Sequence, residues 1–391
     1  MSKLNIGERT KHINPSKIRE VLTKVQNLTD QGIEVANFSI GRPDFDTPEH
    51  IKEATRKALA EGKVHYASSA GIIELREAIC YRMKEDYALQ FDPDEVIITG
   101  GASQANYIAT QTILNPGDEV IVPEPMYVYY SGWSYLGGAK CVSFPIREED
   151  DFIINSIELE KYITPKTKAI ILTSPHNPTG QVYGKACLLE LAKLAKKYDF
   201  YVISDDIYNK MLYDNVEYFN IASISGMKER TIIIGSFSKT YAMDGWRVGY
   251  LIAPKEIISG AMKMHQHTLT CINTFVQYGA TTALMSSQEC VEQMVSEFDR
   301  RRLLVLSYLD KMSIPYVRPR GAFYVFPNIK QFGFVSEKFC DFLLEKARVA
   351  VVPGNAFGQG GEGYIRIADT VPYEVIEEGM ERFKEAVQKL Q

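Results

Sequence analysis

Short apolar runs alternate with helical patterns through the middle of the chain. The apolar runs predict six strands, at residues 95–99, 119–122, 169–173, 201–204, 231–234 and 248–252. The periodicity between them predicts helices, for example over 103–114, which Asn115-Pro116-Gly117 ends, and over 185–197. Strands without regular polar alternation are typical of parallel sheets covered on both faces, so the pattern predicts an α/β architecture.

The C-terminal part has a different pattern. A long helical stretch covers residues 286–312, short strands follow at 322–326 and 364–367, and a final helix lies near 372–389. We interpret this part as a smaller domain that the N-terminal arm joins. The predicted division is a large domain at 46–283 and a small domain made of 1–45 and 284–391.

Composition narrows the class of protein. The chain has 391 residues and a net charge of −5, which argues against nucleic acid as a partner. The six cysteines are scattered without a CxxC pair, as in proteins that keep reduced thiols in the cytosol. The first residues contain no apolar signal segment, and no apolar run approaches the length of a membrane helix. We therefore expect a cytoplasmic protein with no membrane contact.

Polar or glycine-rich clusters follow four of the predicted strands. They read GGASQ after residue 99, SPHNPTG after 173, DDIY after 204 and GSFSK after 234. Ligands of open α/β sheets bind beyond the carboxyl ends of the strands, so four such clusters indicate a common site.

Part of this site has the composition of an anion site. The two glycines at 100–101 allow close approach of the backbone, and the first amides of the next helix could hold an anion, although the same turn also occurs without a ligand. Hydroxyl and guanidinium donors from the cluster after residue 234 could reach the same anion. The candidate phosphate contacts are Gly101, Ala102, Ser103, Ser236, Ser238 and Arg247.

Lys239 lies between these donors, just after an apolar strand. An ordinary lysine is solvated, but burial beside positive charge lowers the pKa and favours the neutral amine, which forms Schiff bases with carbonyl compounds. A phosphate site beside such an amine indicates pyridoxal phosphate. That cofactor needs an acidic partner for its pyridine nitrogen, and Asp205 or Asp206 could serve, unless they simply cap the following helix.

At this point the sequence resembles the class I aminotransferases of fold type I, which depend on pyridoxal phosphate. The matching segments are GRPDFDTP (41–48), HYASSAGIIELREAI (65–79), GGASQA (100–105), PEPMYVYY (123–130), SPHNPTG (174–180), SDDIY (204–208), SFSKTYAMDGWRVGY (236–250), PRGAFY (319–324) and YIRIA (364–368). They occur in the family's order over nearly the whole chain. The resemblance implies a mostly parallel seven-stranded sheet flanked by helices, with a smaller α+β domain.

The resemblance also implies roles for single residues. Lys239 resembles the lysine that forms the Schiff base and then moves the proton, and Asp205 resembles the partner of the pyridine nitrogen. Tyr208 and Asn177 resemble the donors to the ring's phenolic oxygen, and Tyr127 resembles the aromatic residue stacked on the ring. Tyr66 resembles a tyrosine that reaches the phosphate of the neighbouring subunit, which implies a homodimer with shared sites.

The substrate end of the site follows from the same resemblance. Arg366 resembles the arginine that binds the substrate α-carboxylate, with Asn177 and the backbone of Gly41 beside it. Ser16, Lys17, Arg42 and Arg320 are candidates for contact with the distal group of the substrate.

Two positions depart from the family's pattern. Many relatives have Glu where this chain has Arg42, a cation that could favour an acidic substrate or point to solvent. Many also have Glu where this chain has Asp206, so the choice of Asp205 rests on alignment to Tyr208. His265 and His267, two residues apart, are a poor metal signal, so we expect no metal.

The predicted function is transamination between an L-amino acid and a 2-oxo acid. The alternative is a carbon–sulfur β-lyase of the same fold, which would share every cofactor residue and release ammonia and pyruvate. A ligand-sensing regulator with this fold would need a DNA-binding module, for which the residues before 41 leave no room.

Overall fold

A seven-stranded sheet forms the centre of the computed structural model, which describes residues 6–13 and 15–390. Its spatial order is β2-β8-β7-β6-β5-β3-β4, and β8 runs antiparallel to both neighbours while the other pairs are parallel. The strands are β2 (Val96–Thr99), β3 (Glu119–Glu124), β4 (Lys140–Pro145), β5 (Thr167–Thr173), β6 (Tyr201–Asp205), β7 (Thr231–Ser236) and β8 (Gly249–Ile252). The predicted mostly parallel α/β sheet is confirmed.

The apolar pattern identified six of these strands but missed β4. This strand pairs only with β3, and the structure leaves Lys140 and Ser143 exposed on it. An edge strand with exposed polar positions lacks the continuous apolar run that marks its buried neighbours.

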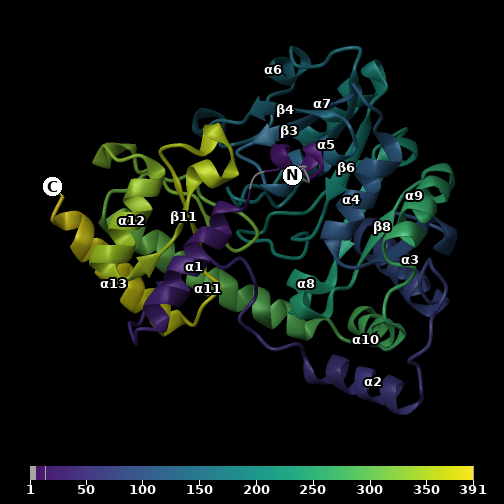
Figure 1. Cartoon of the computed structure of the whole chain (residues 1–391), viewed down its shortest axis with the longest axis horizontal. Coiled ribbons are helices and arrows are strands. Elements are labelled where there is room, and N and C mark those ends of the chain that lie inside the picture. Colours follow the sequence, from purple (N-terminus) through teal and green to yellow (C-terminus); the bar gives the residue numbers. More distant parts are fainter. Residues whose placement is uncertain (1–5, 14, 391) are drawn as a thin grey trace, which may run out of the picture.

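Helices cover both faces of the sheet (Figure 1). One face packs on α4 (Ala102–Ile113), α5 (Tyr129–Leu136) and α9 (Lys255–Thr268). The other face packs on α3 (Ile73–Tyr87), α7 (Lys185–Tyr198) and α10 (Thr274–Met285), and α2 (Glu49–Ala60) lies against α10. Ile170 and Ile171, adjacent on β5, contribute to opposite cores, as the two-residue period of a strand requires.

A second hydrophobic core joins the N-terminal region to the C-terminal region. In it, Ala36 and Phe38 pack with side chains of α11 (Glu289–Lys311), α12 (Ser336–Ala347) and α13 (Tyr373–Gln388). The short strand β1 (Ala36–Asn37) pairs in parallel with β10 (Val349–Ala350). Figure 1 shows α11, α12 and α13 to the left of the large sheet, with α1 (Lys17–Thr29) beside them.

A small antiparallel sheet lies between this second core and the large sheet. Its order is β11 (Val352–Pro353), β12 (Ile365–Ala368) and β9 (Tyr324–Val325). The predicted strand at 322–326 is thus shorter than expected. The predicted long helix begins at Glu289 rather than at 286, after the polar residues Ser286 and Ser287.

Two further findings concern the cysteines and the length of the helices. All six cysteines are free thiols. No helix within residues 6–13 and 15–390 is both long and apolar enough to cross a membrane.

Candidate active site

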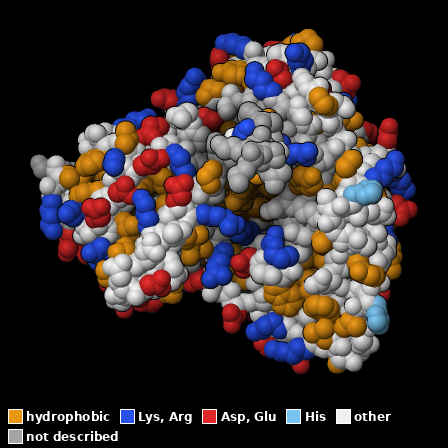
Figure 2. Space-filling view, viewed as in Figure 1, with side chains coloured by type: hydrophobic (Ala, Val, Ile, Leu, Met, Phe, Trp, Pro, Cys, Tyr) orange, Lys and Arg blue, Asp and Glu red, His pale blue; other side chains and the backbone are white. Residues whose placement is uncertain are grey.

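A cavity of about 340 Å³ opens at the carboxyl ends of the central strands, and residues of α1 and β12 contribute to its lining. Figure 2 shows the surface hollowed near the middle of this face, with Lys and Arg side chains around the hollow. The structure brings most of the predicted site residues to this cavity: Gly41, Ala102, Ser103, Tyr127, Asn177, Asp205, Tyr208, Ser236, Ser238, Lys239, Arg247 and Arg366 all line it.

Lys239 projects into the cavity from α8 (Phe237–Thr240), the short helix that directly follows β7. Its Nζ donates a hydrogen bond of 2.6 Å to the carbonyl oxygen of Gly41. Burial lowers the pKa of Lys239 to about 8; the Asp244 carboxylate opposes this shift, and the guanidinium groups of Arg366 and Arg247 add to it. At neutral to mildly alkaline pH a sizeable fraction of this amine is therefore uncharged and nucleophilic.

Hydroxyl, guanidinium and backbone N–H donors gather at one end of the cavity. Ser236 caps α8, its Oγ accepting from the backbone N–H of Ser238 at 3.1 Å, and the two hydroxyl oxygens lie 2.9 Å apart. The guanidinium of Arg247 donates to the carbonyl of Gly100 at 3.0 Å. These groups face the first turn of the twelve-residue helix α4, whose free amides favour an anion.

Gly101 is the residue before α4 and is not itself among the cavity-lining residues. Its φ of +81° is a left-handed conformation that favours glycine, and a Cβ there would lie 2.6 Å from Nη2 of Arg247. Glycine at this position therefore lets the guanidinium lie directly against the start of the helix.

Asp205 lies at the end of β6 and is fully buried. Its Oδ2 accepts two hydrogen bonds, from Nδ2 of Asn106 at 2.9 Å and from the hydroxyl of Tyr130 at 2.8 Å. Its Oδ1 has no hydrogen-bond partner among the described residues. Burial raises the pKa of Asp205 to about 6, and the bonds from Tyr130 and Asn106, together with the nearby backbone N–H of Ile207, limit the rise.

The adjacent carboxylate is held away from the cavity. Asp206 accepts from the hydroxyl of Ser204 at 2.6 Å and from the amide of Asn220 at 2.7 Å, and it does not line the cavity. Asp206 directly follows β6 and continues its pairing through a backbone bond to Ile234, so its side chain points to the opposite face from that of Asp205. The geometry favours Asp205, as the alignment to Tyr208 does.

Arg366 marks another end of the cavity. Nη1 donates to Oδ1 of Asn177 at 3.1 Å, Nη2 donates to the carbonyl of Ser39 at 2.9 Å, and Nε has no partner among the described residues. The guanidinium lies over the ring of Tyr324, 4.4 Å from its centroid. None of the described carboxylates pairs with it. A buried guanidinium with only neutral partners is well suited to an incoming carboxylate.

Tyrosines form a further wall. The hydroxyl of Tyr208 lies 2.8 Å from that of Tyr324, and the ring of Tyr127 packs edge-on against Tyr129 and Tyr130, with centroids 5.2 and 5.5 Å apart. A Cβ on Gly41 would lie 2.3 Å from the hydroxyl oxygen of Tyr324, so a larger residue there would displace the Tyr324 side chain or this segment.

Four candidates do not line this cavity. Tyr66, predicted to reach the phosphate of a neighbouring subunit, is 89% exposed, and its predicted role stays a prediction. Of the candidates for the distal group, Ser16 lines the cavity, whereas Lys17 pairs with Glu337. The side chain of Arg42 is 63% exposed and 3.9 Å from Asp244, and neither it nor Arg320 lines the cavity.

Sequence reasoning missed several cavity residues. Asn106 and Tyr130 hold Asp205, Tyr324 meets Tyr208, and the outer wall is formed by Ile18, Arg19, Leu22, Tyr129, Trp133 and Asp244. Asn106 is a polar residue on the buried face of α4, as Thr110 is, and this polarity does not indicate which group it contacts. Within the described ranges, no group of three or more His, Cys, Asp or Glu side chains could hold a metal ion.

Comparison with known proteins gives a single family. Residues 33–383 match the family described as "Aminotransferase class I and II". The chain is 44% identical to an aspartate aminotransferase of Pyrococcus abyssi and 43% identical to aromatic-amino-acid aminotransferase 2 of Thermococcus litoralis, in each case over 98% of both chains. The solved structure of Thermus thermophilus aspartate aminotransferase with maleate is 38% identical, with a TM-score of 0.94 over 98% of this chain and 100% of that one.

These relatives are named as transaminases, so they do not favour the β-lyase alternative. Similarity at this level, over nearly the full length of both chains, shows more than a common fold. The chain belongs to the class I and II aminotransferases.

Proposed function

We propose that this aminotransferase uses pyridoxal phosphate, held by the cavity around Lys239, to move an amino group between an L-amino acid and a 2-oxo acid. The observation that carries the proposal is the position of one amine. Lys239 lies in the same cavity as a set of anion donors, a buried carboxylate with a free oxygen, and a buried arginine without an acidic partner. These three sets of groups would suit a phosphate, a protonated ring nitrogen and a substrate carboxylate, and all of them surround one nucleophilic amine.

The residues fit the proposed cofactor group by group. Ser236, Ser238, Arg247 and the start of α4 offer donors to a phosphate. The free Oδ1 of Asp205 could accept from a protonated ring nitrogen. Tyr208 and Asn177 could donate to a phenolic oxygen, and the ring of Tyr127 offers an aromatic face. When bound, pyridoxal phosphate supplies an aldehyde that links to amines and a ring that stores the electron pair released at Cα.

The protein's own groups then carry out binding and proton movement. Arg366 would hold the substrate α-carboxylate in two hydrogen bonds, which fixes the orientation of the Cα–H bond. Lys239 in its uncharged form would accept the Cα proton at Nζ and later release it. Arg366 is buried and Lys239 is half-buried in the cavity wall, so a bound cofactor and substrate would displace water from this exchange.

Residues from α1 and α5 would meet the distal part of the substrate. Ile18, Leu22, Tyr129 and Trp133 supply apolar surface, and Arg19 supplies a cation. Because Val21 and Val25 of α1 pack with Leu344 of α12 and Ala350 of β10, we propose that α1 moves with a small domain of residues 1–45 and 284–391 against a large domain of 46–283. Ion pairs from Lys17 to Glu337 and from Lys24 to Asp341 join α1 to α12 and support this division.

The test is a half-reaction with purified protein. After loading with pyridoxal phosphate, single L-amino acids are added, and the visible absorbance of the lysine-bound cofactor is followed as it converts to the pyridoxamine form. We expect loss of that absorbance with release of a 2-oxo acid. Lys239→Ala should bind the cofactor without the lysine-bound absorbance and should not turn over; full activity of this variant would refute the proposal.

Lys263→Ala is a matched control, because Lys263 lies on α9 outside the cavity. Release of ammonia, with the lysine-bound absorbance regenerated and no conversion to the pyridoxamine form, would instead indicate a lyase. The screen also identifies the preferred amino acid.

We also propose a homodimer with shared sites and a cytoplasmic location. Tyr66 is 89% exposed, and Val64, two residues before it, is exposed as well. Leu269 is 45% exposed, and its side chain lies close to Gly100, next to the anion donors. An exposed tyrosine and apolar side chains near the site are typical of an interface.

Mixing two inactive variants tests the shared site. Refolding Lys239→Ala with Tyr66→Ala should restore activity in mixed dimers, since one site of each then has both residues. A monomeric mass in solution, or no restored activity beyond that of Tyr66→Ala alone, would exclude the shared site.

A further inference from the structure

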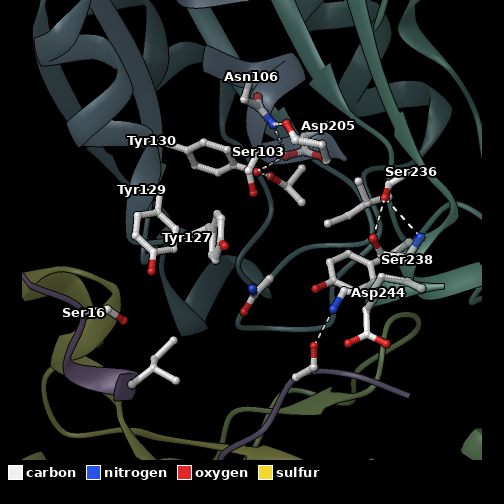
Figure 3. A pocket seen from close by; sticks show the side chains of 18 of the residues that line it. Ser16, Ser103, Asn106, Tyr127, Tyr129, Tyr130, Asp205, Ser236, Ser238 and Asp244 are labelled. Carbon is white, nitrogen blue, oxygen red and sulfur yellow. Dashed lines mark hydrogen bonds between the residues drawn. The ribbon is translucent and has the colours of Figure 1, made fainter. Parts of the chain in front are cut away.

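Asp205 is held by two donors that come from different helices. Asn106 lies on α4 and Tyr130 on α5, and both point at the carboxylate (Figure 3). Their bonds of 2.9 and 2.8 Å end on the same oxygen, Oδ2. Two donors on one oxygen fix the plane of the carboxyl group and leave Oδ1 as the only oxygen free to face the cavity.

The donors also determine where a proton can reside. The Nδ2 of Asn106 lies between two acceptors, Oδ2 of Asp205 and the carbonyl of Ala102 at 3.1 Å, so it can only donate. The hydroxyl of Tyr130 lies 2.5 Å from Oγ1 of Thr173, which can accept or donate. A proton on Oδ2 would face the amide hydrogens of Asn106, so the network excludes it from this oxygen and directs it to Oδ1.

All of these groups are buried. Asn106, Tyr130, Thr173 and Asp205 are each at most 4% exposed, so water does not replace a lost donor at little cost. The titratable groups near Asp205 are Tyr130 and Tyr127 from the α5 side and Asp206, the residue directly after β6, and none of them is a cation. The ionised form of Asp205 thus depends on neutral donors.

We propose that Asn106 and Tyr130 are positioning residues, which fix the orientation of the Asp205 carboxylate, favour its ionised form and present Oδ1 to the ring nitrogen of the cofactor. This inference rests on the proposed function, because it assigns a task toward pyridoxal phosphate. It adds two residues to which the sequence analysis assigned no role, although Tyr130 ends the matching segment PEPMYVYY and Asn106 directly follows GGASQA.

The decisive measurement compares two ligands for the cofactor-free protein. One is pyridoxal phosphate, and the other is an analogue in which a CH group replaces the ring nitrogen. Only the first can bond to Oδ1 of Asp205, so the ratio of their dissociation constants reports this contact. Tyr130→Phe and Asn106→Leu should each reduce the preference for pyridoxal phosphate by about tenfold, the size expected for one hydrogen bond to a charged group.

Tyr107→Phe is the matched control, since it removes a hydroxyl from the next residue of α4 and makes no bond to Asp205. Its ratio should equal that of the wild-type protein. Equal weakening of both ligands in Tyr130→Phe would show a merely structural role and overturn the proposal, as would a ratio within twofold of the wild-type value. Asn106→Ala replaces Asn106→Leu if the larger side chain prevents folding.

A second readout needs no cofactor. Carbon-13 NMR of the aspartate carboxyl groups should show the pKa of Asp205 rising by about one unit in either variant, because each loses a donor to the ionised form. An unchanged midpoint in both variants would overturn the proposal. Failure of the wild-type protein to bind pyridoxal phosphate would instead remove the proposed function, and the carboxyl titration would still decide whether the donors act on Asp205.

Discussion

Nζ of Lys239 donates a hydrogen bond to the carbonyl oxygen of Gly41, 198 positions earlier in the chain. The acceptor is a neutral carbonyl group and not a carboxylate, so no direct ion pair holds the ammonium form. Burial therefore lowers the pKa of this amine, while a carboxylate farther away, that of Asp244, partly opposes the shift. This balance of effects can be measured.

The first prediction concerns the protonation of Lys239. In the cofactor-free protein its acetylation rate should rise with pH and level off above a midpoint of about 8. Asp244→Asn should lower this midpoint, because the carboxylate raises the pKa, and Asp150→Asn, at an exposed position far from the cavity, should leave it unchanged. Competitive labelling with mass spectrometry measures each lysine separately. A midpoint near 10.5 would show that burial does not act on this amine.

The second prediction concerns Arg366. Arg366→Lys keeps a positive charge but loses the planar pair of donors, so binding of amino acid and of 2-oxo acid should weaken by about 10- to 100-fold. Affinity for the cofactor should change little. Titration of the cofactor-loaded protein with substrate gives both quantities, and Arg320→Lys, outside the cavity, is the control. Unchanged substrate affinity in Arg366→Lys would contradict its assignment.

The third prediction concerns substrate choice. Arg19 is the cation that α1 brings to the cavity wall, among apolar side chains. Arg19→Leu should lower the kcat/KM ratio of aspartate to phenylalanine by about tenfold, since a distal carboxylate loses its counter-charge while an aromatic ring does not. Arg42→Leu should leave the ratio unchanged, because Arg42 lies outside the cavity. If Arg42→Leu lowered this ratio and Arg19→Leu did not, Arg42 and not Arg19 would determine the preference for an acidic substrate.

The fourth prediction concerns stability. Asp369 is 1% exposed, and neither carboxyl oxygen has a partner among the described residues; burial raises its pKa to about 7. The folded protein then binds more protons than the unfolded chain between pH about 4 and 7, so the residue destabilises the fold increasingly as pH rises through that window. Asp369→Asn should raise the free energy of unfolding at pH 8 by on the order of 1–3 kcal/mol.

Thermal unfolding at two pH values checks this prediction. The gain should be smaller at pH 5 than at pH 8, because the wild-type carboxyl is then largely protonated. An equal gain at both values would point to a steric effect and not to the buried charge. Asp150→Asn again serves as the exposed control.

The sequence predicted the central sheet because its strands are apolar on both faces. Ile170 and Ile171 show why, since each neighbour on β5 enters a different core. The edge strand β4 escaped prediction because Lys140 and Ser143 are exposed there. The length of β9 escaped too, because Ala322 and Phe323 are buried and apolar but lie outside the strand.

The site was predictable where a reactive side chain lies at the end of a strand or soon after it, as with Asp205 and Lys239. It was not predictable where a side chain reaches the site from a helix face or from a distant segment. Asn106 and Tyr130 belong to helices, and a periodicity argument assigns both to packing. Their role depends on how α4 and α5 lie against β6, which no local pattern specifies.

The pairing of β1 with β10 has a consequence for synthesis on the ribosome. All seven strands of the large sheet lie before residue 253, so that sheet can assemble while the later part of the chain is still being made. Ala36 and Phe38, by contrast, must wait for side chains as late as Val387 before their core is complete. We expect the earliest segment of the chain to be among the last to reach its final place, exposing apolar residues to chaperones and proteases until then.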